Sequence, residues 1–295
     1  MNLKGCYVAL VTPFTKKNNV DYDKIKHLVE FHIKMGTSGI IPVGTTGESP
    51  TLTKKEHLKI IETVIFASNQ RIQVIPGTGS NNTEEVLYLT KFSKELGANA
   101  VLVVLPYYNR PSQEGLFQHF KKICEIGIDL ILYNIPGRTG INLLPNTLLR
   151  IKKECNNIIG VKESSGMLDQ ISEISIKVKG ISILSGDDSL TLPILSVGGV
   201  GVISVIANFA PYIIDEMISY YFEGRVKEAQ AIHHKLYPMC KALLTFGSNP
   251  APVKYIMSKL DFNVGIPRLP IVELNKEKKV ELDRILEKLE ITPIL

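Results

Sequence analysis

The sequence contains few cysteines and no long apolar run. Its four cysteines form no C-x-x-C pair, which favours free thiols in a reducing compartment over a disulfide framework. No segment approaches the run of about 18 apolar residues that a membrane-spanning helix needs. The initial segment MNLKGCYVALVTPF has too short an apolar run for a secretion signal and lacks a small-residue cleavage site. We therefore predict a cytoplasmic protein that neither spans nor binds a membrane.

Blocks of like charge are also missing. The 295 residues include 34 basic and 29 acidic side chains, a net charge of +5, and both signs are spread along the chain. A nucleic-acid-binding surface needs a basic stripe or cluster, so nucleic acid is not predicted as a partner. The mild positive charge is compatible with small anionic substrates.

Motifs for metals and nucleotides are absent as well. The six histidines show neither H-x-x-x-H nor mixed ligand spacing, so no metal site is predicted. The segment GTTGES, residues 44–49, lacks the GxxxxGK[ST] spacing of a phosphate-binding loop. GTGSNN and GGVGV do not complete the G-x-G-x-x-G pattern of dinucleotide-binding proteins.

Eight short apolar runs, rich in β-branched residues, recur along the chain. They are CYVAL, GIIPV, IQVIP, AVLVVL, DLILY, NIIGV, ISILS and GVISV, beginning near positions 6, 39, 72, 100, 129, 157, 181 and 201. Most intervals are about 20–33 residues, the length of a strand with a crossover helix. The runs are apolar nearly throughout, which is typical of parallel strands covered by helices on both faces.

The segments between these runs carry helix signals. Asp21 is suited to cap one helix, and Thr53 followed three residues later by Glu56 forms a capping-box pattern before another. Gly36 and Gly97 stand where two of the helices are expected to end. The alternation of strands and helices indicates crossover units of a parallel sheet.

Eight such units predict an α/β fold, a closed (β/α)8 TIM barrel with a C-terminal helical appendage. An open sheet of eight parallel strands is the alternative. We assign residues 1–224 to the catalytic barrel. Residues 225–295 carry further helical patterns, which predict a separate C-terminal helical region.

Polar residues follow five of the predicted strands. The second, fourth, fifth, sixth and seventh strands are followed or ended by GTTGES, YYNRPSQEG, YNIPGRTG, Lys162 and GDD. In a barrel of this kind the catalytic groups stand at the carboxyl ends of the strands. Five polar strand ends at one face predict an active site there.

Lys162 ends the apolar run IIGV, and it is the most informative of these residues. One interpretation is a lysine that extends its ammonium group from a strand end into water. The functional interpretation is a nucleophile that forms a Schiff base with a carbonyl substrate. Apolar surroundings disfavour the ammonium form and release a reactive amine, which explains a lysine at the mouth of a buried strand.

Two further strand ends, the fifth and the second, offer complementary chemistry. Tyr133 can exchange protons with a carbinolamine, or it is an aromatic residue of the barrel rim. Arg138 offers a forked donor for carboxylate, or it is a solvated loop charge. Thr45 and Thr46, with their neighbouring glycines, can cradle an anion or simply form a tight turn.

These residues lie in segments that together resemble a known family. The chain is similar to the dihydrodipicolinate synthases, within the pyruvate-dependent aldolase family that includes N-acetylneuraminate lyase. The segments that carry the likeness are ALVTPF, GTTGES, PYYNRPSQEGL, YNIPGRTG, GVKESSG, SGDD and GVISV. GRTG favours the synthase branch, because lyase relatives usually have other residues at position 138.

The resemblance implies an activity and roles for individual residues. It implies condensation of pyruvate with L-aspartate 4-semialdehyde in diaminopimelate and lysine biosynthesis, with a covalent Schiff base in place of a cofactor. Lys162 would form the Schiff base, Tyr133, Thr45 and Tyr108 would relay protons, and Tyr108 would reach the site of a neighbouring subunit. The remaining contacts with substrate would come from Thr46, Arg138, Gly186 and Ile203. A homotetramer, as a dimer of dimers, is the assembly that the resemblance implies.

A site for inhibitory L-lysine is also implied. The matching positions are Ser49, Lys54, His57, Asn81, Glu85 and Tyr107. Lys54 replaces the histidine that is common in lysine-sensitive members, and Pro50 replaces a small residue. A cation at Lys54 would repel the ammonium groups of the effector, so we predict weak or altered inhibition.

Two other functions compete with the synthase. The first is another pyruvate-dependent aldolase, such as an N-acetylneuraminate or keto-deoxy sugar lyase, against which Arg138 and Tyr108 argue. The second is a barrel that has lost catalysis and serves as a binding subunit. The complete set of polar strand ends argues against the second.

Overall fold

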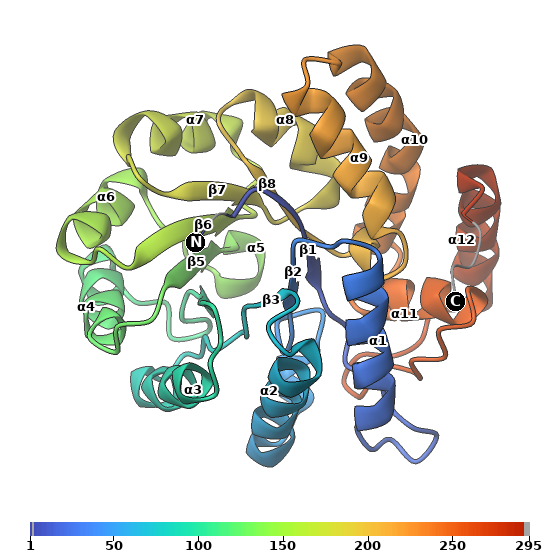
Figure 1. Cartoon of the computed structure of the whole chain (residues 1–295), viewed down its shortest axis with the longest axis horizontal. Helices are drawn as coiled ribbons and strands as arrows, with labels where there is room; N and C mark the ends of the chain where they lie inside the picture. Colours follow the sequence, from blue (N-terminus) through green and yellow to red (C-terminus); the bar gives the residue numbers. More distant parts are fainter. Residues whose placement is uncertain (2, 292–295) are drawn as a thin grey trace.

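The computed structural model describes residues 1 and 3–291, and its centre is a barrel of eight parallel strands (Figure 1). The strands are β1 (Gly5–Ala9), β2 (Gly39–Ile41), β3 (Gln73–Val74), β4 (Val101–Val104), β5 (Leu130–Asn134), β6 (Ile158–Glu163), β7 (Ser182–Ser185) and β8 (Gly201–Ser204). Each strand lies within or beside one of the eight predicted runs.

Backbone hydrogen bonds close the barrel between its two remaining edges. The sheet runs in the order β3-β2-β1-β8-β7-β6-β5-β4, which leaves β3 and β4 at the ends. Leu102 N donates to Pro76 O at 2.9 Å, and Thr78 N donates to Leu102 O at 3.0 Å. The predicted (β/α)8 barrel is therefore confirmed, and the open sheet is not formed.

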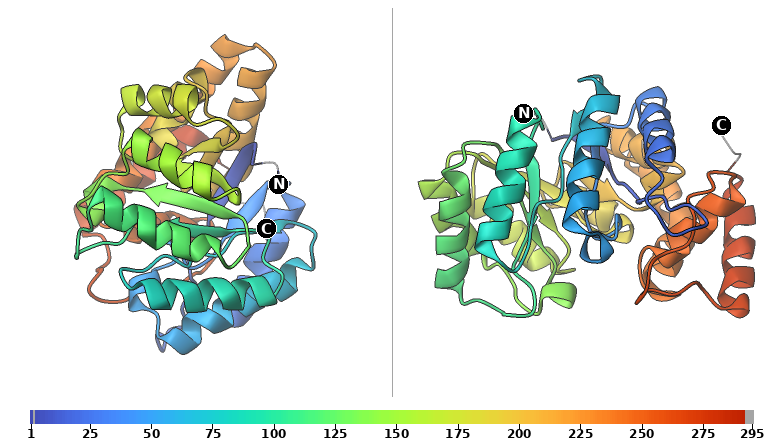
Figure 2. Two further views of the ribbon diagram at one scale, coloured as in Figure 1. Left: turned by 90° about the vertical axis from the view of Figure 1, so that its left-hand side faces the viewer. Right: turned by 90° about the horizontal axis from the view of Figure 1, so that it is seen from below.

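Helices surround the strands, as both views of Figure 2 show. In chain order the barrel helices and short turns are α1 (Tyr22–Lys34), η1 (Ser49–Thr51), α2 (Lys54–Ser68), α3 (Thr83–Glu95), α4 (Gln113–Cys124), α5 (Pro136–Thr139), α6 (Pro145–Glu154), α7 (Leu168–Lys177), η2 (Asp188–Leu190), α8 (Thr191–Ser196), η3 (Ile206–Asn208) and α9 (Pro211–Phe222).

The local helix signals act as predicted. Asp21 accepts a hydrogen bond from Lys24 N at 2.9 Å at the start of α1. Thr53 and Glu56 form the reciprocal capping box of α2. These caps satisfy N–H groups that a helix leaves unpaired in its first turn.

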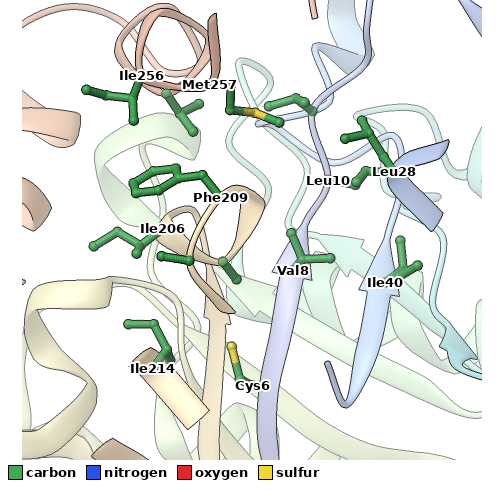
Figure 3. Packing of buried hydrophobic residues seen from close by; sticks show 14 of the residues in the cluster. Cys6, Val8, Leu10, Leu28, Ile40, Ile206, Phe209, Ile214, Ile256 and Met257 are labelled. Atoms are coloured by element: carbon green, nitrogen blue, oxygen red, sulfur yellow. The ribbon is translucent and has the colours of Figure 1, made fainter. Parts of the chain in front are cut away.

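Three further helices form the C-terminal helical region, which is likewise confirmed (Figure 1). They are α10 (Val226–Thr245), α11 (Ala251–Lys259) and α12 (Lys276–Leu289). Their buried side chains join the cluster that also contains Val8 and Ile206 of the barrel. Figure 3 shows Ile256 and Met257 of α11 close to Phe209. The boundary at residue 225 stays a prediction, because this apolar core continues across it.

The direction of each strand side chain follows from the barrel. Ile131, Tyr133, Leu184 and Ile203 belong to the cluster in the barrel interior. Val161 of β6 instead packs into the cluster between strands and helices. Because side chains alternate along a strand, Lys162 faces the interior.

Within the described part of the chain, no helix combines the length and apolarity that crossing a bilayer requires.

Candidate active site

Lys162 and Tyr133 lie side by side at the carboxyl ends of β6 and β5, where they are register partners. Lys162 is only 6% exposed and Tyr133 only 5%. Lys162 Nζ lies 4.2 Å from the centre of the Tyr133 ring. The amine thus occupies an enclosed position against an aromatic face, with a phenol as its neighbour.

Gly186, just after β7, leaves room for the Lys162 side chain. A Cβ atom at this position would lie 2.9 Å from Lys162 Cε and 1.8 Å from Ser164 Oγ. Gly186 N donates to Glu163 O at 2.9 Å, which brings the backbone of the two strand ends together. A side chain at 186 would therefore displace the side chains of Ser164 and Lys162.

A cavity of about 370 Å³ opens beside Tyr133 at this end of the barrel. Its lining includes four of the predicted site residues, Thr45, Tyr108, Tyr133 and Arg138. Lys162 does not line this cavity and is linked to it through the Tyr133 ring. Predicted groups from the second, fourth and fifth strand ends therefore surround one small volume, and Lys162 of the sixth lies against the Tyr133 ring.

The other predicted substrate contacts lie deeper in the molecule. Thr46 is 3% exposed, and its hydroxyl accepts a hydrogen bond from Asn249. Ile203 is buried in the same interior cluster as Tyr133. Thr46, Gly186 and Ile203 do not line the cavity.

Tyr108 differs from the other lining residues because the residue is 90% exposed. Its backbone is in the left-handed region, with φ of 73°. The structure therefore directs this phenol away from its own barrel core.

Two acidic residues near Lys162 were not assigned a role from the sequence, although the GDD segment marked their strand end. Burial raises the pKa of the Asp187 carboxyl, and the charge of Lys162 opposes that shift. Burial also raises the pKa of Asp188. Asp188 Oδ2 accepts hydrogen bonds from Val205 N at 2.9 Å and Ile206 N at 3.2 Å. Asp188 thus fixes the turn after β8 beside the amine.

A buried carboxylate adjacent to Lys162 also went unpredicted. Glu163 is 1% exposed and accepts hydrogen bonds from Asn134 Nδ2 at 3.1 Å, Ser165 N at 2.7 Å and Gln170 Nε2 at 3.3 Å. Asn134 Nδ2 also donates to Asn142 Oδ1 at 2.8 Å. This network joins β5 and β6 to Asn142, just after the short helix α5 that carries Arg138.

The residues predicted to bind an effector gather mostly in a second cavity of about 180 Å³. Five of the six line it, namely Ser49, Lys54, His57, Glu85 and Tyr107. Asn81 does not line it, although its carbonyl oxygen accepts a hydrogen bond from Asn109 at 2.8 Å. Ser49 and Tyr107 also line the first cavity, so the two cavities share part of their walls.

The groups within this second cavity have defined contacts. His57 Nε2 lies 3.1 Å from Gly77 O, and burial lowers the pKa of His57. Lys54 Nζ lies 3.8 Å from the centre of the Tyr88 ring, which holds the ammonium group on an aromatic face.

Across residues 1 and 3–291, no three His, Cys, Asp or Glu side chains are grouped in a way that would hold a metal ion.

A TIM barrel with an enclosed lysine at one strand end and a tyrosine at the next defines a class I aldolase-type lyase. The chain belongs to the dihydrodipicolinate synthetase family, whose model matches residues 2–289.

Known members of this family are similar over nearly the whole chain. The chain is 48% identical to the 4-hydroxy-tetrahydrodipicolinate synthase of Endomicrobium trichonymphae, covering 96% of this chain and 97% of the relative. It is 47% identical to that of Methanocaldococcus jannaschii, covering 97% and 98% of the two chains.

Solved structures agree with these sequence relatives. Dihydrodipicolinate synthase from Aquifex aeolicus is 43% identical, with a TM-score of 0.95, covering 98% of this chain and 99% of that one. The enzyme from Acinetobacter baumannii, solved in complex with pyruvate, is 38% identical, with a TM-score of 0.94 and coverage of 98% and 100%.

Proposed function

We propose that this protein catalyses the reaction named for its curated relatives, the 4-hydroxy-tetrahydrodipicolinate synthases. Its substrates are pyruvate and L-aspartate 4-semialdehyde. The observation that carries the proposal is the enclosed amine of Lys162 against the ring of Tyr133, 4.2 Å from its centre. The pyruvate complex of the Acinetobacter baumannii enzyme supports the choice of ketoacid.

The proposed reaction proceeds through covalent intermediates on Lys162. The amine adds to the ketone carbon of pyruvate, and loss of water gives a protonated imine. The imine withdraws electrons, so a methyl proton leaves and an enamine forms. The enamine carbon attacks the aldehyde carbon, whose oxygen takes up a proton. The amino group of the second substrate then displaces the lysine nitrogen, which closes the ring and frees Lys162.

Different residues of the predicted site would serve different steps of this reaction. Tyr133 exchanges protons with the carbinolamine, with Thr45 and Tyr108 completing the relay. Arg138 binds the carboxylate of the aldehyde substrate with its forked donors. Thr46 binds the carboxylate of pyruvate. The backbone at Gly186 and Ile203 lines the ketoacid end. Apart from the Schiff base on Lys162, this scheme needs no cofactor.

Trapping the imine tests this function directly. Incubation with pyruvate, reduction with borohydride and peptide mass spectrometry should give a stable adduct on Lys162. An unmodified protein would favour a barrel that binds without catalysis. Product analysis with L-aspartate 4-semialdehyde and with sugar aldehydes separates the synthase from the sugar lyases.

Replacing Tyr133 with phenylalanine is expected to slow turnover by about 10²- to 10⁴-fold, the range for loss of a general acid–base group. The substitution keeps the ring that lies against Lys162. Steady-state kinetics of Tyr133→Phe should be compared with those of Tyr221→Phe. Tyr221 donates to Leu195 O, remote from the cavity, and its loss should leave the rate within twofold or so. A near-normal rate for Tyr133→Phe would reject the relay.

We also propose that the protein acts as a cytoplasmic homotetramer, built as a dimer of dimers. The 90% exposure of Tyr108 supports a role for its phenol across a subunit interface. The four cysteines are free thiols, which supports a reducing compartment.

For the second cavity we propose binding of L-lysine with weakened affinity. The Glu85 carboxylate and the Ser49 hydroxyl suit a zwitterionic amino acid, whereas Lys54 adds a cation to the lining. Inhibition assays should therefore show weak or altered inhibition by L-lysine, and Lys54→His should strengthen it. Strong inhibition of the unaltered protein in the micromolar range would contradict this prediction.

A further inference from the structure

The C-terminal region reaches the ketoacid end of the site through Asn249, which lies between α10 and α11. Asn249 Nδ2 lies 2.9 Å from Thr46 Oγ1, a contact between residues 203 positions apart in the chain. Thr46 is buried, so this amide contacts a hydroxyl that water hardly reaches.

This contact determines which hydrogen-bonding role remains for the Thr46 hydroxyl. An amide nitrogen donates and does not accept, so Thr46 Oγ1 is the acceptor in this pair. The hydroxyl has one hydrogen of its own, which is therefore left to donate elsewhere. A donor is what a carboxylate requires, because an ionised carboxylate only accepts hydrogen bonds.

The other end of the same amide points to a role beyond stability. Asn249 Oδ1 is buried and has no hydrogen-bond partner among the described residues. Buried polar atoms in proteins are nearly always paired, and an unpaired one reduces stability. The hydrogen bond from Asn249 Nδ2 to the Thr46 hydroxyl therefore explains the presence of this asparagine better than a contribution to stability does.

The turn that carries Thr46 is fixed independently of Asn249. Glu48 has a left-handed backbone, with φ of 57°, and its carboxylate lies 2.6 Å from Lys254 Nζ. Arg268 N donates to Glu48 Oε2 at 2.8 Å, and Thr12 Oγ1 donates to Gly47 O at 2.6 Å. Because these contacts hold the backbone, loss of the Asn249 amide should alter the hydroxyl more than the turn.

We propose that Asn249 is a positioning residue, which fixes the Thr46 hydroxyl as a hydrogen-bond donor to the carboxylate of the ketoacid. The proposal rests on the function proposed above. It makes the C-terminal helical region part of the ketoacid site, although none of its residues lines the active-site cavity. Loss of Asn249 should weaken the use of pyruvate selectively, because Arg138 serves the other substrate from a different loop.

A double-mutant cycle tests the proposal. Asn249→Ala and Thr46→Val should each raise KM for pyruvate by about tenfold, the effect of one hydrogen bond to a charged group. KM for L-aspartate 4-semialdehyde should change less than threefold or so. The double variant should be no worse than Thr46→Val alone, because Asn249 acts only through the hydroxyl. Additive effects on KM would overturn the proposal, as would an unchanged KM in Asn249→Ala.

Two controls separate this proposal from a general loss of structure and from failure of the proposed function. Asn157→Ala removes an amide that donates to Cys124 O and Ile128 O, so it should lower the melting temperature without changing KM for pyruvate. An equal rise of both KM values in Asn249→Ala would indicate a structural role and contradict the proposal. Borohydride trapping of the unaltered protein tests the proposed function independently of the KM measurements. An adduct with no KM effect rejects only the role of Asn249, whereas no adduct rejects the proposed function.

Discussion

Lys162→Ala is expected to abolish the borohydride-trapped pyruvate adduct and to reduce turnover to the background rate. Every covalent step of the proposed reaction requires the amine, and no neighbouring group can replace it. The substitution truncates a side chain against Tyr133 and Gly186, so the barrel should remain folded. Mass spectrometry of the reduced protein and steady-state kinetics measure the two losses.

A second buried lysine, Lys254, allows this experiment to distinguish the proposed nucleophile from another candidate. Burial lowers the pKa of Lys254 to about 8, so the acidity of its ammonium group alone would mark it as a nucleophile. Its Nζ, however, lies 2.6 Å from a Glu48 carboxylate oxygen, and the side chain does not line the active-site cavity. The adduct should therefore map to Lys162 and not to Lys254. A pyruvate adduct that persists in Lys162→Ala would refute the assignment.

Lys254→Met is expected to lower the free energy of unfolding by about 3–5 kcal/mol, the cost of leaving one partner of a buried ion pair without the other. Both partners are at most 1% exposed. Lys254 Nζ also lies 4.1 Å from the centre of the Phe14 ring. Without the ammonium group, the Glu48 carboxylate retains the backbone N–H of Arg268 as a partner. Urea denaturation followed by circular dichroism measures the loss.

The same helix supplies a matched control. Lys259 of α11 also pairs with a carboxylate, Asp283 at 3.1 Å, but its side chain is 45% exposed. Lys259→Met should cost at most about 1 kcal/mol, because water screens an exposed pair. Glu48→Gln combined with Lys254→Met should recover part of the loss, since no uncompensated charge then remains. A cost for Lys254→Met no larger than that of Lys259→Met would show that the pair does not hold the turn.

The local elements of the fold could be predicted because their causes are local. The capping box of Thr53 and Glu56 spans three positions, and each partner satisfies the other within one helical turn. The strands were located by apolar runs, but GIIPV and IQVIP ended later than the strands. β2 stops directly before Pro42, since proline has no N–H to donate to the sheet.

The site could be predicted in part for the same reason. A parallel barrel brings all carboxyl strand ends to one face, so polar residues at strand ends imply a shared location. The placement of Lys162, Tyr133, Thr45 and Arg138 at this face follows in this way, and their roles stay a prediction. The short helix α5, which carries Arg138, was not predicted, because its four residues have no helical repeat that a pattern could reveal.

The sequence by itself therefore determined the barrel, its main helices and the strand ends that carry chemical groups, because periodicity and capping act between near neighbours. Only the tertiary structure decided that Asn249 contacts Thr46, that Lys254 pairs with Glu48 and that Asn134 donates to Glu163. These contacts join residues that are distant in sequence. Whether a buried amide or carboxylate finds its partner depends on how the elements pack, which no local pattern specifies.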